Sequence, residues 1–219
     1  MISLIVAKDK KNGIGKSNNL PWRLSQEMDY FKRITTPKNP FEHAVIMGRK
    51  TWESIPNKFK PLKNRLNIVL TSQNIIKDGN FLNTFSFNSL EIALDFIRDY
   101  SKQILQKPLA EIFIIGGGSI YKEALVKKLV TNLYITEVYD DFSCDTFLEG
   151  LDLDKFQLME CSKFHMENCK VNQRDINYRF LKYQEKEYLL ESQLKGYQNC
   201  EELQYINLLN KICNEGIIR

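Results

Sequence analysis

The chain has 219 residues, of which 43% are hydrophobic and 26% are charged, an ordinary composition for a globular protein. Its formal net charge of +4 is dispersed, without a basic stripe interleaved with aromatic residues, which excludes nucleic acid as the expected partner. A weakly basic protein can still favour an anionic small molecule. No apolar run reaches the length of a membrane span, and the apolar start of the chain lacks the basic segment of a signal peptide, so we expect a soluble, cytoplasmic protein without a membrane partner.

The five cysteines and two histidines do not form the spacings of a metal site or of a disulfide framework. The cysteine count is odd and there is no C-x-x-C pair, so we expect reduced thiols in a cytosolic protein. No serine–histidine–aspartate or cysteine–histidine arrangement indicates nucleophilic catalysis, and two histidines do not favour a metal centre. We therefore expect neither a metal nor a covalent enzyme intermediate.

Short apolar runs alternate with helical patterns along most of the chain, which is typical of an α/β fold with a mostly parallel sheet and helices on both faces. Two later runs, 156–164 and 176–183, alternate apolar and polar residues around a polar connection at 166–175, which predicts an antiparallel hairpin at one side of the sheet. The expected strands are 4–7, 44–47, 66–70, 112–115 and 133–138, and the expected helices are 25–34, 89–100 (behind a serine cap) and 119–127.

The segment between the first strand and the first helix is rich in glycine and asparagine at residues 12–19 and ends in Leu20-Pro21-Trp22. These residue types permit unusual backbone angles, so we expect a mobile loop. Trp22 has two interpretations: it covers a bound ligand, or it packs in the core beneath a surface turn.

Glu27 occupies an unusual place in the first helix. Leu24, Met28, Phe31 and Ile34 recur at helical spacing and predict an inward apolar stripe. Glu27 precedes Met28 by one residue and Phe31 by one turn, so its carboxylate points into or along that stripe. A carboxylate there is costly unless something pairs with it. We expect the partner to be a ligand that presents hydrogen-bond donors.

At one strand-to-helix junction Gly48 is followed by Arg49, Lys50 and Thr51. Cationic side chains and a hydroxyl grouped at the start of a helix suit a phosphate. Arg49 and Lys50 can equally be solvated surface charges.

A second junction, Gly116-Gly117-Gly118-Ser119, follows a strand and opens a helix, so a phosphate could approach backbone N–H groups there. The run is not the G-x-G-x-x-G fingerprint, and a tight strand-to-helix turn explains it equally well. Two anion sites at neighbouring strand ends suit a dinucleotide, and the cationic pair of the first junction suits an additional 2′-phosphate.

Near Gln184 the composition changes. Residues 185–199 are charged and weakly periodic, which indicates a linker or an exposed helix. Residues 201–213 then carry Leu203, Ile206 and Leu209 at helical spacing, an amphipathic helix that needs a surface to bury against. That surface belongs to its own domain, or to another domain or subunit.

Taken together, four segments in order resemble dihydrofolate reductase closely: the glycine loop with residues 20–22, the run 45–56, the run 115–121 and Asp145-Thr146-Phe147. The resemblance covers about residues 1–183, and four ordered motifs make a chance match improbable. It implies the dihydrofolate-reductase-like three-layer fold, a mostly parallel central sheet with an antiparallel C-terminal strand and helices on both faces.

The resemblance implies NADPH-dependent reduction of 7,8-dihydrofolate to tetrahydrofolate for one-carbon and thymidylate synthesis, with antifolates as further ligands. Glu27 falls on the family's acid, which would hold N3 and the 2-amino group of the pterin and polarise the ring, while water delivers the proton to N5. Trp22 and Thr136 join it as catalytic residues, and Arg65 falls on the arginine that pairs with the substrate's α-carboxylate. The implied substrate-binding residues are Val6, Ala7, Glu27, Met28, Phe31, Ile55, Leu62, Arg65, Ile115, Tyr121 and Thr136.

On the cofactor side, the family carries an arginine in its vertebrate forms where this chain has Ser72, so recognition of the 2′-phosphate shifts toward Arg49. The implied NADPH-binding residues are Ala7, Ile14, Gly15, Leu20, Gly48, Arg49, Lys50, Thr51, Ser54, Leu70, Thr71, Ser72, Ile115, Gly116, Gly117, Gly118, Ser119, Ile120 and Tyr121.

The tail carries a second resemblance. Residues 201–212 are similar to the opening helix of thymidylate synthase and follow a linker, as in the fused reductase–synthase of many protozoa. The expected organisation is a reductase domain at 1–183, a linker at 184–200 and a truncated synthase start at 201–219, and a full-length fusion would be a homodimer. A stand-alone reductase with an unrelated terminal helix is the alternative.

Two other functions remain to be weighed. A catalytically silent folate- or nucleotide-binding domain is not supported, since the acid, the glycines and the arginine are all present. A pterin- or riboflavin-pathway reductase of the same fold is disfavoured by Glu27 and Arg65, because those substrates lack the glutamate tail.

Overall fold

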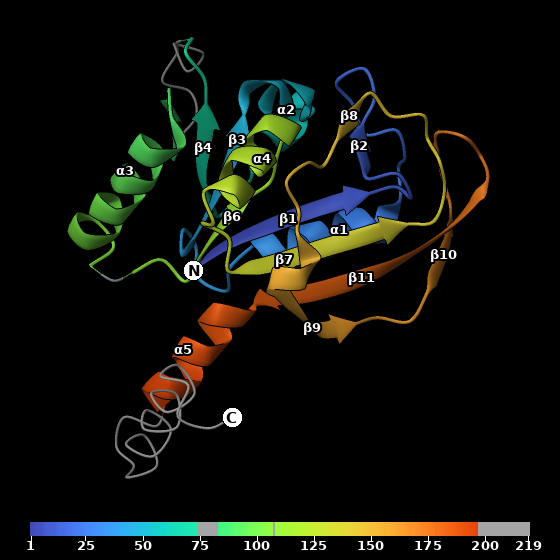
Figure 1. Cartoon of the computed structure of the whole chain (residues 1–219). Helices are drawn as coiled ribbons and strands as arrows, with labels where there is room; N and C mark the ends of the chain where they lie inside the picture. Colours follow the sequence, from blue (N-terminus) through green and yellow to red (C-terminus); the bar gives the residue numbers. More distant parts are fainter. Residues whose placement is uncertain (74–82, 107, 197–219) are drawn as a thin grey trace, which may run out of the picture.

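The computed structural model describes residues 1–73, 83–106 and 108–196, which fold into three layers around one large sheet (Figure 1). The order of the described strands is β10-β11-β7-β1-β6-β3-β4-β5, and β9 also pairs with β11. Neighbours from β7 to β5 are parallel, whereas β11 is antiparallel to β7, β9 and β10. The expected sheet, mostly parallel with an antiparallel C-terminal strand, is confirmed. The strands of this sheet are β1 (Ile2–Lys8), β3 (His43–Gly48), β4 (Leu66–Leu70), β5 (Thr84–Phe87), β6 (Glu111–Ile114), β7 (Asn132–Val138), β9 (Phe156–Cys161), β10 (His165–Asn168) and β11 (Asp175–Glu185).

Helices cover both faces of the parallel strands, which is why those strands are continuously apolar. On β1, Leu4 packs in a cluster with α3 and α4, and its neighbour Ile5 packs in the cluster that α1 covers. Ser89 caps α3 as expected, because its hydroxyl accepts a hydrogen bond from the Ile92 N–H at 3.3 Å. The helices are α1 (Ser25–Thr35), α2 (Arg49–Ser54), α3 (Leu90–Gln103), α4 (Gly118–Val126) and α5 (Lys186–Gly196), with 3₁₀ turns at Asn57–Phe59 and Leu153–Lys155.

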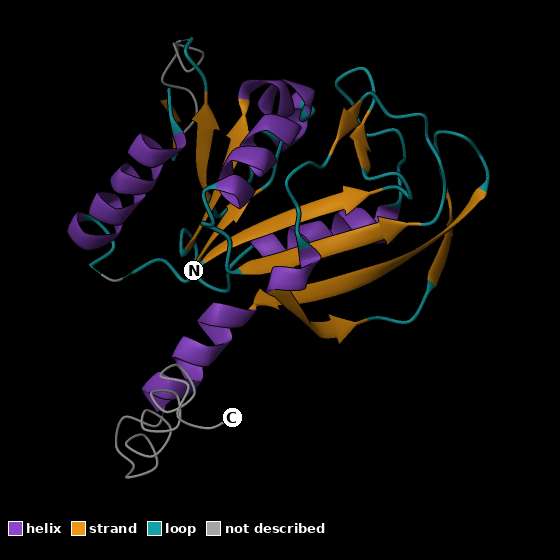
Figure 2. Cartoon of the chain, viewed as in Figure 1, coloured by secondary structure: helices purple, strands orange, loops and turns teal. Residues whose placement is uncertain are grey.

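Two expectations about irregular segments are wrong. The polar connection expected at 166–175 contains most of β10, which pairs with β11 from His165 to Asn168. The loop expected at residues 12–19 contains β2 (Gly13–Gly15), which pairs antiparallel with β8 (Thr146–Phe147). Both strands are short and lie at edges, so neither has the apolar run that identifies a buried strand. In Figure 2, the loops at the ends of β1 and β7 surround the β2–β8 pair.

After β11 the chain continues directly into α5, which extends away from the sheet (Figure 1). Of the two interpretations of residues 185–199, the helix is the correct one over residues 186–196, and its side chains at 186, 187 and 190–192 are exposed. The helix expected at 201–213 lies outside the described residues, and the boundaries of the linker and of the reductase domain stay predictions.

Cys144, Cys161 and Cys169 are free thiols, and the other two cysteines lie outside the described residues. None of the helices within residues 1–73, 83–106 and 108–196 combines the length and the hydrophobicity that a bilayer crossing requires.

Candidate active site

Most of the expected site residues lie near the carboxyl ends of the parallel strands, the edge at which open α/β sheets bind ligands, whereas Arg65 directly precedes β4 and lies at the amino end of that strand. β1, β3 and β6 end there at Lys8, Gly48 and Ile114, and helix α1 begins beside them. The described geometry therefore brings together the parts of the chain that the sequence motifs singled out.

Glu27 lies in the first turn of α1 and faces the sheet, with only 7% of its surface exposed. Its carboxylate accepts a hydrogen bond of 3.4 Å from the hydroxyl of Thr136 on β7. Thr136 is held in register between Ala7 of β1 and Phe180 of β11. The acid and its hydroxyl partner are thus fixed by the centre of the sheet.

Burial raises the pKa of Glu27 from its ordinary value near 4.5 to about 7, because the charged form loses its hydration. The hydrogen bond from Thr136 opposes this shift, and the negative charge of Glu167 adds to it. A carboxyl group that titrates near neutrality in a cleft is a candidate for holding or transferring protons.

The apolar stripe expected on α1 is only partly correct. Leu24 is fully buried, but Met28 is 46% exposed. The buried positions of α1 itself are Glu27 and Thr35, so its inward face is centred on the acid. Met28 instead lies beside the buried face, because a helix advances by about 100° per residue and places neighbours on different faces.

Trp22 packs in the core, which is the second of its two interpretations. It is 2% exposed and meets the ring of Phe142 edge-on at 5.0 Å, within a cluster that also contains Leu24 and Tyr178. Its indole Nε1–H is buried and has no acceptor among the described residues. Such a donor calls for an acceptor from a ligand or from water.

Arg65 is a buried cation, with 5% of its surface exposed. Its Nη1 donates a hydrogen bond of 2.6 Å to the Thr35 hydroxyl and its Nε donates one of 3.1 Å to the Lys63 carbonyl. None of the described carboxylates forms an ion pair with it. Burial lowers its pKa to about 10, so the guanidinium remains charged at neutral pH. A buried charge with neutral partners favours an incoming anion.

Between Glu27 and Arg65 the chain supplies an apolar wall. Four of the expected substrate residues are partly buried against one cluster under α1, namely Phe31, Ile55, Leu62 and Ile115. Ala7 packs with the Trp22 cluster. Val6 does not join these residues, since it packs on the opposite face of the sheet with Ile14 and Tyr121.

The glycine turn between β6 and α4 lies against the end of β3. The Gly48 N–H donates a hydrogen bond of 2.7 Å to the Gly116 carbonyl, and the Tyr121 hydroxyl donates one of 2.7 Å to the Ile5 carbonyl. Gly116 has a φ of 121°, and a Cβ there would lie 3.3 Å from the Tyr121 hydroxyl. Glycine suits this position because the backbone angle is unfavourable for other residues and Tyr121 and Thr51 take up the space of a side chain.

Helix α4 starts at Gly118, and a Cβ there would lie 3.2 Å from the Phe147 carbonyl oxygen of the β2–β8 pair. Ser119 is in the first turn of α4, and the Ile120 side chain lies 3.4 Å from where a Cβ on Gly48 would be. The first N–H groups of a helix lack partners within the helix and carry partial positive charge. A helix start of this kind can accept a phosphate at its backbone N–H groups.

The junction of Gly48 with Arg49, Lys50 and Thr51 is less open than its sequence suggests. Arg49 begins α2 but donates a hydrogen bond of 2.8 Å to Glu53, one turn later, and Lys50 is exposed. The Thr51 hydroxyl lies 3.3 Å from the position that a Cβ on Gly117 would take. The Ser54 hydroxyl is bonded to the Thr51 carbonyl at 2.8 Å.

Beyond β4, Leu70 is 8% exposed, and the Thr71 N–H donates a hydrogen bond of 2.7 Å to the carbonyl of Phe87 on β5. Ser72 follows on the surface. The expected adenosine-side residues Leu70, Thr71 and Ser72 thus lie at the end of β4.

The loop that leads to Trp22 is tied to the β8 segment. The Asp145 carboxylate accepts a hydrogen bond of 2.7 Å from the Ser17 N–H, and the Asp145 N–H donates one of 3.0 Å to the Gly15 carbonyl. Ile14 is buried and Leu20 is 48% exposed. Of the expected nicotinamide-side residues, Ile14 and Gly15 therefore lie in the strand β2 that pairs with β8, and Leu20 lies beyond it.

Sequence reasoning missed Glu167 and Asp9. Glu167 is on β10 and reaches α1, although about 140 residues separate them. Asp9 is 2% exposed and accepts hydrogen bonds from the N–H groups of Lys11 and Gly13. A carboxylate after the first strand is visible in the sequence, whereas the contact of Glu167 leaves no local pattern.

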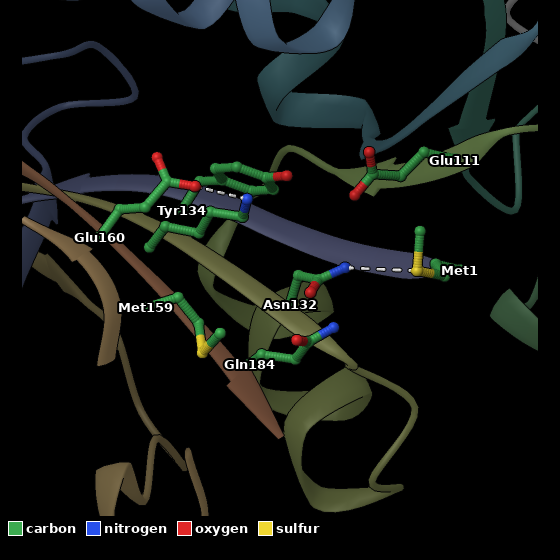
Figure 3. Close-up of a pocket in the computed structure, with 8 residues that line it drawn as sticks. Met1, Glu111, Asn132, Tyr134, Met159, Glu160 and Gln184 are labelled. Carbon is green, nitrogen blue, oxygen red and sulfur yellow. Dashed lines mark hydrogen bonds and ion pairs between the residues drawn. The ribbon is translucent and has the colours of Figure 1, made fainter. Parts of the chain in front are cut away.

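A cavity of about 240 Å³ lies elsewhere, at the amino ends of β1 and β7 (Figure 3). Met1 and Tyr134 are among its lining residues, together with the Lys182–Glu160 ion pair of 2.7 Å. None of these residues belongs to the motifs, and the amino ends of parallel strands are not where such sheets usually bind ligands. The candidate site is therefore the one around Glu27, and not this cavity.

Comparison with known proteins identifies the family. The family model for dihydrofolate reductase matches residues 1–185. The dihydrofolate reductase of Schistosoma mansoni is 38% identical over 161 residues, 73% of this chain and 83% of that protein. That of Sus scrofa is 37% identical over 187 residues, 84% of this chain and 97% of that protein.

A bifunctional dihydrofolate reductase-thymidylate synthase of Arabidopsis thaliana is 39% identical over 163 residues, which are 74% of this chain. The match spans only 28% of the length of that bifunctional relative. The family match covers the residues of the candidate site. The chain therefore belongs to the dihydrofolate reductase family, whose members are NADPH-dependent oxidoreductases.

Proposed function

We propose that this chain reduces 7,8-dihydrofolate to 5,6,7,8-tetrahydrofolate, with NADPH as the hydride donor. The observation that carries the proposal is the buried Glu27, held against Thr136 with a pKa of about 7. A carboxylate that is desolvated but ionisable near neutrality suits a heterocycle that offers hydrogen-bond donors and gains a proton as it reacts.

In this proposal Glu27 accepts hydrogen bonds from N3 and the 2-amino group of the pterin. The ring is thereby oriented and polarised toward protonation at N5, and water carries the proton because one carboxyl group cannot both hold this edge and reach N5. The buried Trp22 N–H is a further donor at this end of the site. The hydride goes to C6 and the proton to N5, which completes the reduction of the C=N bond.

The wall formed by Phe31, Ile55, Leu62 and Ile115 would contact the ring system and the aminobenzoyl group. Arg65 would pair with the α-carboxylate of the glutamate tail, because its planar donors match a carboxylate. Its neutral partners in the structure leave its charge available for that anion.

Bound NADPH would supply the hydride. The glycine turn Gly116–Gly118 with Ser119 would hold its pyrophosphate, and Ala7, Ile14 and Leu20 would contact the nicotinamide. Arg49, Lys50 and Thr51 would lie near the adenosine and its 2′-phosphate, which requires Arg49 to exchange Glu53 for the phosphate.

The test is a hydride-transfer assay, in which the absorbance of NADPH is followed with dihydrofolate as substrate. Glu27→Gln should reduce turnover strongly and leave NADPH affinity nearly unchanged. Glu149→Gln, an exposed carboxylate paired with Lys122, is the matched control. Absence of NADPH consumption by the unmodified chain would refute the proposal, and equal losses in turnover and NADPH affinity would make Glu27 structural.

We also propose that this chain is the reductase part of a longer bifunctional enzyme with a thymidylate synthase, and that the full-length enzyme is a homodimer. Bifunctional relatives of Arabidopsis thaliana and Daucus carota match it over 28–30% of their length. The amphipathic pattern at 201–213 supports the same proposal. Sequencing the transcript beyond codon 219 tests it, and an early stop codon would favour a stand-alone reductase.

A further inference from the structure

Helix α1, which carries Glu27, has no N-cap side chain of its own. Its N-cap residue is Leu24, which has no side-chain acceptor for the free N–H groups of the first turn. The carboxylate of Glu167 on β10 takes that place. It accepts a hydrogen bond from the Ser25 N–H at one oxygen and from the Gln26 N–H, at 3.1 Å, at the other.

Glu167 is itself fixed by the sheet. It pairs with Ile176 in the β10–β11 ladder, and the Tyr178 hydroxyl donates a hydrogen bond of 3.1 Å to its carboxylate. Partial burial opposes its ionisation, but the hydrogen bonds from Ser25, Gln26 and Tyr178 outweigh burial and keep its pKa below the ordinary value. Glu167 is therefore charged when Glu27 titrates, and a negative charge at the start of a helix is stabilising.

Ser25, whose N–H binds Glu167, precedes Glu27 by two residues in α1. The depth at which the first turn sits against the sheet determines the distance from Glu27 to Thr136, so the anchor of that turn also positions the carboxylate. The groups that interact electrostatically with Glu27 come from every neighbouring element: Glu167 on β10, Thr136 on β7, Tyr178 on β11, Tyr121 on α4 and Tyr30 on α1. Glu167 is the one among them that is negatively charged at neutral pH.

We propose that Glu167 is a positioning residue for Glu27: it caps α1 from the edge of the sheet and fixes the acid's depth in the site. This role rests on the proposed function of Glu27. Glu167 does not touch the reacting atoms. It acts by two separable means, the geometry of its two acceptor oxygens and its negative charge, and conservative variants divide them.

The experiment compares Glu167→Gln, Glu167→Asp and Glu167→Ala with Glu160→Gln, a carboxylate on the adjacent β9 that is paired with Lys182. The readouts are amide hydrogen exchange at Ser25 and Gln26, the pKa of Glu27 from carboxyl ¹³C NMR, and kcat. Glutamine removes the charge and keeps only one of the two acceptor oxygens, so amide exchange should accelerate at one of Ser25 and Gln26 while the other stays protected. We expect kcat to stay within about twofold and the Glu27 pKa to fall by about half a unit.

Aspartate keeps the charge but is shorter by one methylene group. We expect exchange at Ser25 and Gln26 to accelerate by about tenfold, kcat to fall by a similar factor and the Glu27 pKa to remain near its original value. Alanine should show both effects, and Glu160→Gln neither.

The proposal is overturned if Glu167→Asp and Glu167→Ala keep the original exchange and kcat, or if Glu160→Gln reproduces their effects. It is also overturned if kcat falls only in proportion to the unfolded fraction measured in urea. Failure of the proposed function has a different signature, because the unmodified chain would then not consume NADPH with dihydrofolate, while the exchange data at Ser25 and Gln26 still report the cap.

Discussion

The Thr136 hydroxyl donates a hydrogen bond of 3.4 Å to the Glu27 carboxylate and so joins the central strand β7 to the first turn of α1. Because this bond stabilises the charged carboxylate, it opposes the effect of burial on the Glu27 pKa. Replacing Thr136 with valine preserves the shape and removes the donor. The Glu27 pKa should rise by about half a unit, as measured by carboxyl ¹³C NMR. Thr136→Ser should restore the original value, and an unchanged pKa in the valine variant would show that the hydroxyl does not act on the acid.

Glu27 should make stability depend on pH. Its folded-state pKa of about 7 exceeds the ordinary value of 4.5, so the folded protein binds the proton more tightly than the unfolded chain. The free energy of unfolding should therefore fall as the pH rises between these values, by on the order of 3 kcal/mol. Glu27→Gln should lack this dependence and be the more stable protein in mildly alkaline buffer. Urea denaturation in acidic and alkaline buffers checks the prediction, and parallel pH dependences in the two proteins would contradict it.

Arg65 should act on the substrate's tail and not on the ring. Replacing Arg65 with leucine removes a buried cation whose protein partners are neutral, so the fold should tolerate the change. KM for dihydrofolate should rise by about 10- to 100-fold, since a charge-assisted pair is lost, with a much smaller effect on kcat. A dihydropterin without the glutamate tail is the control substrate, and its kinetics should not change. If both substrates suffer equally, Arg65 supports the fold and not the tail.

Gly116 and Gly150 offer a matched pair for the cofactor side. Both have positive φ, at 121° and 79°, so alanine should strain the backbone at either position and lower the free energy of unfolding by about 1 kcal/mol or more. Only at Gly116 would the new Cβ approach Tyr121 and Thr51, at 3.3 and 3.5 Å. Gly116→Ala should therefore weaken NADPH binding, measured by fluorescence titration, and Gly150→Ala should not. Equal binding by the two variants would exclude the glycine turn as the cradle.

The parallel core could be predicted because its strands are continuous apolar runs. All four residues Ala44–Met47 are fully buried, and a run of this kind identifies a strand covered on both faces. The edges could not be predicted in the same way. The alternating run 156–164 did predict β9, which pairs antiparallel with β11, whereas β10 lies in what reads as a polar connection and was missed. β5 is short and was also missed.

In the candidate site too, local sequence patterns identified some residues, whereas contacts between distant segments could not be read from the sequence. Glu27 stood out in the sequence because a carboxylate interrupts an apolar helix, and the structure places it on the buried face. The capping of α1 by Glu167 depends on two segments that meet only through the β10–β11 pairing, and no spacing in the sequence reports it. The exposure of Met28 likewise depends on which face of α1 the sheet covers.

Thr35 uses its hydroxyl twice, since it donates a hydrogen bond of 2.8 Å to the Phe31 carbonyl and accepts the one from Arg65. The guanidinium is thus anchored to the last turn of the same helix whose first turn carries Glu27. Eight residues separate Glu27 from Thr35, a rise of about 12 Å along the helix axis. The length of helix α1 therefore sets the distance between the group that would hold the ring and the group that would hold the tail. One rigid element would thus determine how long a substrate the site accepts.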